Sequence, residues 1–207
     1  MKNYLFNLGK NAKRASQDYV SSKKKDKILR DYINLILNYQ DKIIIENQKD
    51  LEKAKANKLK ENLTKRLLLD KNKILQITNS IKTIISFKDP VDQTLRKWKR
   101  PNGLQIEKKT ISIGVISVIY ESRPNVTSDV AALCFKSGNP VILKGGSEAY
   151  FSNKILANLF KKALRKNRVN NNYVQFIESK DRKVVDILLS KMVGYIDLVI
   201  PRGGKGL

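Results

Sequence analysis

Polar and glycine residues follow three short apolar segments of this 207-residue chain. Asn125 comes soon after the apolar residues 113–119, and Lys144 comes directly after residues 141–143. Arg202 and the two glycines behind it follow residues 196–200. Helical patterns separate these segments, and such an alternation predicts a parallel sheet. Ligands collect at the carboxyl edge of such a sheet, so we expect these polar residues to form one functional edge.

Asn125 could serve in either of two ways. Its side-chain amide can donate a hydrogen bond to an oxygen that gains negative charge during a reaction. It can equally cap the helix predicted over residues 126–137. The residues alone leave both interpretations open.

Lys144, Gly145, Gly146 and Ser147 combine a cation with glycines that let a ligand approach the backbone, which suits a phosphate or a ribose. Arg202, Gly203 and Gly204 repeat the combination later in the chain, and Arg202 could contact a phosphate. Both segments could instead be ordinary solvated turns. Arg123 is a further cation close to Asn125, and it could bind acidic groups of a substrate.

Cys134 is the only thiol, and the chain has no histidine. The cysteine lies in the apolar helical stretch 131–135, where burial would raise the pKa of the thiol and make it inert. We interpret Cys134 as a core residue. A zinc site and acid–base catalysis by histidine are not expected in this segment. One cysteine also excludes an internal disulfide framework and fits a reducing cytoplasm.

The formal net charge of +23 raises the question of a nucleic-acid partner. The excess is dispersed, and only 10 of the 42 basic residues are arginine, the residue that suits bidentate readout of phosphates and bases. Lysine, asparagine and isoleucine are residues of A/T-rich codons, so compositional drift explains the charge and a nucleic-acid partner is not favoured. A basic protein that binds nucleic acid or other anions, and a non-catalytic subunit, remain the alternatives. No apolar run reaches the roughly 20 residues of a membrane span.

The chain divides into three parts by pattern. Residues 1–90 read as helices; in the first of them Leu5, Leu8, Ala12, Ala15 and Tyr19 repeat at helical spacing. Residues 91–110 read as a β-hairpin with Asn102-Gly103 at its turn. Residues 111–207 alternate strands and helices as in a doubly wound, Rossmann-like α/β domain. The expected fold class is therefore α/β, with a helical N-terminal region and a hairpin arm.

Three motifs carry a family resemblance. Residues 113–127 (IGVISVIYESRPNVT), 136–149 (KSGNPVILKGGSEA) and 197–204 (DLVIPRGG) resemble the gamma-glutamyl phosphate reductases of proline biosynthesis, in the aldehyde dehydrogenase superfamily. The resemblance implies reduction of L-glutamate 5-phosphate to L-glutamate 5-semialdehyde and phosphate with NADP(H). It also implies that the nucleophilic cysteine lies on a later segment, so we expect the chain to be the front part of a larger protein and inactive alone.

The resemblance also assigns roles to particular residues. It implies that Asn125 is the oxyanion donor, and that the residues around Lys144 and Arg202 bind the cofactor. Superfamily members often carry a glutamate three residues after the lysine, on the ribose hydroxyls, whereas this chain has Ser147 there and Glu148 one residue later. An acidic group would repel a ribose 2′-phosphate, so the serine favours NADP(H) over NAD(H). The hairpin corresponds to an arm that contacts a partner subunit, which implies a homo-oligomer.

Overall fold

A four-stranded parallel sheet lies at the centre of the computed structural model, which describes residues 1–203. Its strands are β3 (Ile116–Tyr120), β4 (Val141–Gly145), β5 (Val174–Phe176) and β6 (Leu198–Arg202), in the order β5-β4-β3-β6. Tyr120 pairs in register with Gly145 on one side and Arg202 on the other, so β3, β4 and β6 end at the same level. The strand ends that carry or precede the predicted site residues therefore share one edge of the sheet.

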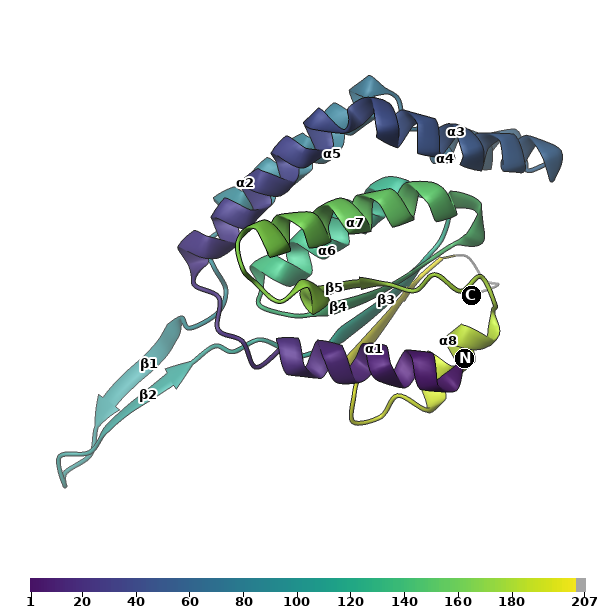
Figure 1. Ribbon diagram of the computed structural model, residues 1–207. Coiled ribbons are helices and arrows are strands. Elements are labelled where there is room, and N and C mark those ends of the chain that lie inside the picture. The colour runs from purple at the N-terminus through teal and green to yellow at the C-terminus, as the bar shows by residue number, and fades with distance from the viewer. Residues whose placement is uncertain (204–207) are drawn as a thin grey trace.

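Helices cover both faces of this sheet (Figure 1). Helices α6 (Pro124–Lys136) and α7 (Tyr150–Lys166) lie on one face, and α1 (Lys2–Ala15) and α8 (Lys183–Ser190) lie on the other. Alternate residues of β3 point to opposite cores, as the two-residue period of a strand requires: Val118 packs in the α6–α7 core and Ile119 in the α1–α8 core. The expectation of a doubly wound α/β fold is confirmed.

The other N-terminal helices form an outer layer. Helices α2 (Ser22–Asn38) and α5 (Lys71–Ser86) pack on α7 and α6, and α3 (Gln40–Ala56) packs on α7 and on α4 (Glu61–Leu67). Short 3₁₀ turns, η1 (Ser147–Ala149) and η2 (Asn171–Tyr173), precede α7 and β5. Among the described residues, no helix combines the length and the apolar character that a membrane crossing needs.

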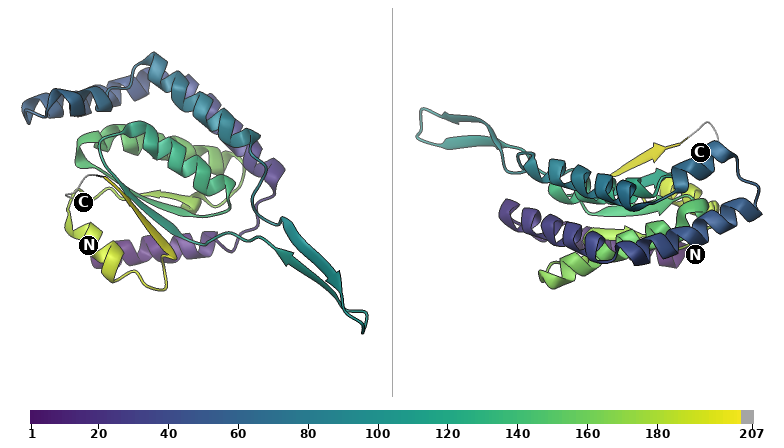
Figure 2. Two further views of the ribbon diagram at one scale, coloured as in Figure 1. Left: turned by 180° about the vertical axis from the view of Figure 1, so that it is seen from behind. Right: turned by 90° about the horizontal axis from the view of Figure 1, so that it is seen from above.

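A hairpin of β1 (Thr94–Lys99) and β2 (Gln105–Lys109) projects from the body of the molecule (Figures 1 and 2). Its turn contains Gly103 at a φ of 88°, a left-handed conformation that glycine adopts without steric cost. The predicted hairpin is therefore confirmed with the expected turn.

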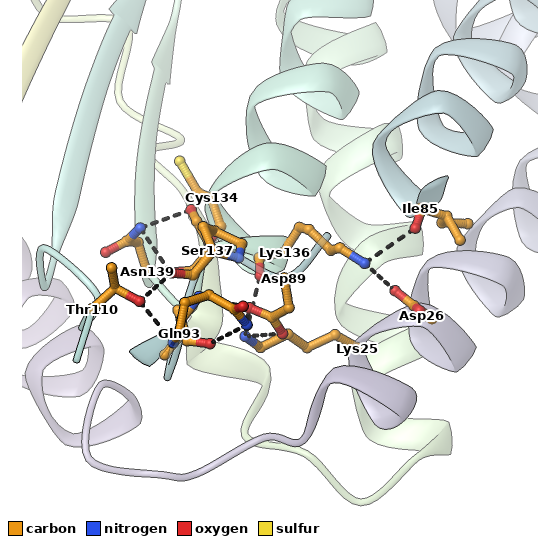
Figure 3. A network of polar contacts seen from close by, with 12 residues as sticks. Lys25, Asp26, Ile85, Asp89, Gln93, Thr110, Cys134, Lys136, Ser137 and Asn139 are labelled. Carbon is orange, nitrogen blue, oxygen red and sulfur yellow. Dashed lines mark hydrogen bonds and ion pairs between the residues drawn. The ribbon is translucent and has the colours of Figure 1, made fainter. Parts of the chain in front are cut away.

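A buried polar network fixes the base of the hairpin to the helical layers (Figure 3). The ammonium of Lys25 on α2 lies 2.9 Å from a carboxylate oxygen of Asp89 and also donates to the carbonyl of Lys136 at the end of α6. Lys136 in turn pairs with Asp26. Removing one partner of such a buried pair leaves an uncompensated charge, so these contacts hold the arm, α2 and α6 together specifically.

Tyr19 departs from its predicted place in the core. It is 82% exposed, because α1 ends at Ala15 and the following residues leave the helix. The other four residues of the predicted stripe, Leu5, Leu8, Ala12 and Ala15, do face the interior.

Candidate functional site

The carboxyl edge of the sheet carries two separate hollows. The first, which we call the Lys144 hollow, has a volume of about 310 Å³ and is lined by Lys144 to Glu148 together with residues around α8. The second, the Asn125 hollow, has a volume of about 360 Å³ and is lined by Arg123, Asn125 and Asp129 together with residues of α4 and α5. The structure thus groups Lys144, Gly145, Gly146 and Ser147 together and separates them from Asn125 and Arg123.

Lys144 lies within β4, which continues to Gly145 rather than ending at Leu143 as predicted. The side chain is buried, and its ammonium donates to the carbonyl of Gly145 at 3.2 Å. Burial lowers the pKa of Lys144, whereas the nearby carboxylates of Glu148 and Asp181 favour its charged form. A partly desolvated cation of this kind interacts strongly with an anion that enters the hollow.

Gly145 and Gly146 make close contacts with neighbouring side chains. A Cβ atom on Gly145 would lie 2.3 Å from Nδ2 of Asn153, and one on Gly146 would lie 2.6 Å from Oε2 of Glu148. Any larger residue would push these side chains away from the edge of the sheet. The two glycines therefore let these side chains pack closely against the loop.

Glu148 has a structural role that the sequence did not reveal. Its Oε1 accepts a hydrogen bond from Oγ of Ser122 at 2.9 Å, and its Oε2 accepts one from Oγ of Ser147 at 3.3 Å. Ser147 itself is exposed at the start of η1. The carboxylate is thus held against the loop after β3, and the serine hydroxyl lies on the open side.

Lys180 and Arg182 also line the Lys144 hollow, and sequence reasoning missed both. They belong to the segment between β5 and α8, more than thirty residues from Lys144 along the chain. Their position after a predicted strand was the only signal available. They add two cations to the hollow, whose lining also holds the carboxylates of Glu121, Glu148 and Asp186.

Asn125 is the second residue of α6 and does not cap it, because the N-cap position belongs to Arg123. Its Nδ2 instead donates to Oδ2 of Asp129 at 3.0 Å, one helical turn further on. An amide nitrogen carries two hydrogens, so one of them stays free for another acceptor. The capping interpretation is therefore wrong, and the geometry leaves Asn125 able to act as a donor.

Asp129 and Arg202 lie close to each other beside Asn125. Burial raises the pKa of Asp129, while the hydrogen bond from Asn125 and the positive charge of Arg202 lower it. Arg202 does not line the Lys144 hollow. Gly203 is exposed and follows it, and the predicted site residue Gly204 lies outside the described residues.

Cys134 is buried in α6, and burial raises the pKa of its thiol to about 12. The thiolate is the nucleophilic form, so this cysteine is inert near neutral pH. The interpretation of Cys134 as a core residue is confirmed.

Comparison with known proteins identifies the relatives of this fold, although a search of protein-family models gives no match. The gamma-glutamyl phosphate reductase of Petrotoga mobilis is 45% identical over 210 aligned residues, which cover 100% of this chain and 50% of that protein. The crystal structure of the Thermotoga maritima gamma-glutamyl phosphate reductase superposes with a TM-score of 0.94 at 36% identity, over 98% of this chain and 49% of that one. The chain is a homologue of the gamma-glutamyl phosphate reductases. It corresponds to their N-terminal part and spans about half the length of the curated relatives it matches.

The chain also shares its architecture with more distant enzymes. A probable aldehyde dehydrogenase from Listeria monocytogenes superposes on 96% of this chain with a TM-score of 0.69 at 12% identity, over 41% of its own length. An engineered glycolyl-CoA reductase solved with bound NADP⁺ superposes on 97% of the chain with a TM-score of 0.68 at 17% identity, over 42% of its length. At these identities the likeness establishes the aldehyde dehydrogenase fold alone.

Proposed function

We propose that this chain forms the cofactor-binding part of an enzyme that reduces L-glutamate 5-phosphate to L-glutamate 5-semialdehyde and phosphate with NADPH. The observation that carries the proposal is the Lys144 hollow at the carboxyl edge of the sheet, in a chain 45% identical to a gamma-glutamyl phosphate reductase. The cofactor would supply the hydride. The residues of this chain would hold the cofactor and position the substrate.

The residues of the Lys144 hollow fit the adenosine end of a dinucleotide. Lys144 provides a partly desolvated cation, and Gly145 and Gly146 line the hollow with no side chain of their own. Lys180 and Arg182 provide additional cations in the lining. Positive groups and an accessible backbone are what phosphates require.

The preference for NADPH over NADH rests on Ser147. Ser147 is exposed, and the single hydrogen of its hydroxyl would turn from the 3.3 Å contact with Glu148 to a ribose 2′-phosphate, whereas a carboxylate at position 147 would repel that phosphate. The nearest carboxylate, that of Glu148, accepts hydrogen bonds from Ser122 and Ser147. The proposal of NADP(H) as the cofactor therefore rests on the serine at position 147, where many superfamily members carry a glutamate.

Asn125 is the proposed oxyanion donor. Asp129 holds one hydrogen of the Asn125 amide, so the other can donate to the acyl oxygen when its carbon becomes tetrahedral. Loss of one such donor typically lowers turnover by about two to three powers of ten. Arg123 and Arg202 would place positive charge beside this substrate.

The nucleophile must come from another segment of the enzyme, because the thiol of Cys134 is buried. We therefore propose that the 207-residue chain alone does not turn over substrate. In the same proposal, residues 1–90 and 111–207 form the cofactor domain, and residues 91–110 contact a second subunit in a homo-oligomer.

Isothermal titration of the chain with NADPH and with NADH tests the proposal. We expect NADPH to bind more tightly, and Lys144→Ala to weaken its binding about tenfold to a hundredfold, because a hydrogen bond to a charged group is lost. Lys10→Ala, which removes an exposed lysine on α1, serves as the control and should change nothing. Absence of NADPH binding, or equal effects of the two substitutions, would contradict the assignment of the hollow.

A further inference from the structure

Several basic side chains that line the Asn125 hollow come from a part of the sequence far from Asn125. Arg123 lies on one wall, next to Asn125 and Asp129. Lys65 and Arg66 of α4 and Lys73 of α5 line the same hollow. The cationic wall therefore combines the loop after β3 with the α4–α5 segment, about 60 residues earlier in the sequence.

The two lysines of this wall already have partners. The ammonium of Lys65 lies 2.7 Å from a carboxylate oxygen of Glu61, and that of Lys73 donates to the carbonyl of Lys65 at 2.8 Å. Within residues 1–203, in contrast, the guanidinium groups of Arg66 and Arg123 make no hydrogen bond or ion pair, and both residues are exposed. Two guanidinium groups are thus available to an anion that enters the hollow.

The position of Arg66 is fixed by a buried clamp immediately after it. Asn47 of α3 is almost fully buried; its Nδ2 donates to the carbonyl of Leu67 at 2.7 Å, and its Oδ1 accepts from the amide of Leu69 at 2.8 Å. Leu67 itself is fully buried. The backbone immediately after Arg66 is therefore held at two points by one amide group.

The same clamp extends to the start of α7, directly after the loop that lines the Lys144 hollow. Nδ2 of Asn47 also donates to Oγ of Ser152, and Asp50 accepts from the backbone amides of Phe151 and Ser152 at the start of α7. Helix α7 follows directly after Gly145 to Ala149. Helix α3 thus positions the α4–α5 segment and the Lys144 loop relative to each other through buried polar groups.

We propose that Arg66 acts with Arg123 to bind the carboxylate of the substrate, at the end remote from the reacting acyl group. Guanidinium groups bind carboxylates through paired, charge-assisted hydrogen bonds. Asn125 lines the same hollow, so a substrate whose acyl oxygen meets this amide would extend its far end along the wall that carries the two arginines. Arg66 is then a specificity-determining residue that selects acyl phosphates with a terminal carboxylate. This assignment rests on the proposed function.

A matched pair of stable phosphonates tests the assignment on the 207-residue chain. In 5-oxo-6-phosphonohexanoate a methylene replaces the labile bridging oxygen of the acyl phosphate, and the remote carboxylate is kept. In 2-oxohexylphosphonate a methyl group replaces that carboxylate. We expect the chain to bind the first compound about tenfold more tightly than the second.

Arg66→Gln should abolish this preference and leave NADPH binding unchanged, whereas Arg30→Gln, an exposed arginine of α2, should preserve both. Persistence of the preference in Arg66→Gln would overturn the inference. Equal weakening of both phosphonates by Arg66→Gln would also overturn it, because Arg66 would then bind the phosphonate end. If the chain binds NADPH but neither phosphonate, the inference fails and the proposed cofactor site stands; if it binds none of the three, the proposed function fails with it.

Discussion

The hydroxyl of Ser122 donates a hydrogen bond to Oε1 of Glu148 at 2.9 Å and so joins the loop after β3 to the loop after β4. Glu148 lines the same hollow as Lys144, whereas Asn125 lines the other hollow. The contact therefore links the loop that leads to Asn125 with the loop that lines the proposed cofactor site. It also fixes a carboxylate close to the cation that we assign to the cofactor.

Replacing Glu148 by Gln should tighten the binding of NADPH. The amide oxygen of the variant can still accept the hydrogen bond from Ser122, but the negative charge near Lys144 disappears. An anionic ligand should then bind about two- to fivefold more tightly, the range expected for a partly exposed charge. Isothermal titration measures this change. Weaker binding would indicate instead that Glu148 contacts the ribose directly.

As the pH rises, the affinity for NADPH should begin to fall at a lower pH than it would if the binding lysine had an ordinary pKa. Burial lowers the pKa of Lys144 from 10.5, so this side chain loses its charge before exposed lysines do, and a neutral amine no longer attracts phosphate. We expect the decline to begin below pH 10.5 and to disappear in Lys144→Arg, because a guanidinium stays protonated. Dissociation constants measured at increasing pH test this. An unchanged decline in the arginine variant would attribute it to another group.

The thiol of Cys134 should resist modification in the folded chain. At a pKa of about 12 its thiolate fraction near pH 8 is about three powers of ten below that of a free cysteine, and burial further limits access. Reaction with a chromogenic disulfide should therefore be slow in buffer and rapid in concentrated guanidinium chloride. Cys134 is the only thiol, so the signal has one source. Rapid reaction of the folded chain would contradict the assignment of Cys134 as an inert core residue.

The order of strands and helices could be predicted because local pattern and burial agree in this chain. Residues of β3 and β4 are buried throughout and mostly apolar, as expected for central parallel strands. The boundaries were less accurate. The strand predicted over residues 113–119 begins only at Ile116, because Gly114 adopts a φ of 123° and its amide donates to the side chain of Asn139 instead of to a neighbouring strand.

The site was predictable only where its residues follow a strand closely. Lys144 and Ser147 lie together as expected from their spacing, whereas Arg66 and Arg182 reach the hollows through tertiary packing of α4 and α8. Local pattern carries no information about such contacts. The partnership of Asn125 with Asp129 was also missed, although a spacing of four residues on a helix could have indicated it.

The ratio of the dissociation constants for NADH and NADPH, compared between the chain and Ser147→Glu, tests the central claim most directly. We claim that the Lys144 hollow holds the adenosine end of NADPH, with the 2′-phosphate near the hydroxyl of Ser147. The introduced carboxylate should repel that phosphate and weaken NADPH binding about tenfold while NADH binding changes little, so the ratio should fall. Ser147→Lys, which introduces a positive charge at the same position, should leave the preference for NADPH intact or strengthen it. A ratio that stays the same in Ser147→Glu would contradict the claim, because the 2′-phosphate would then lie elsewhere.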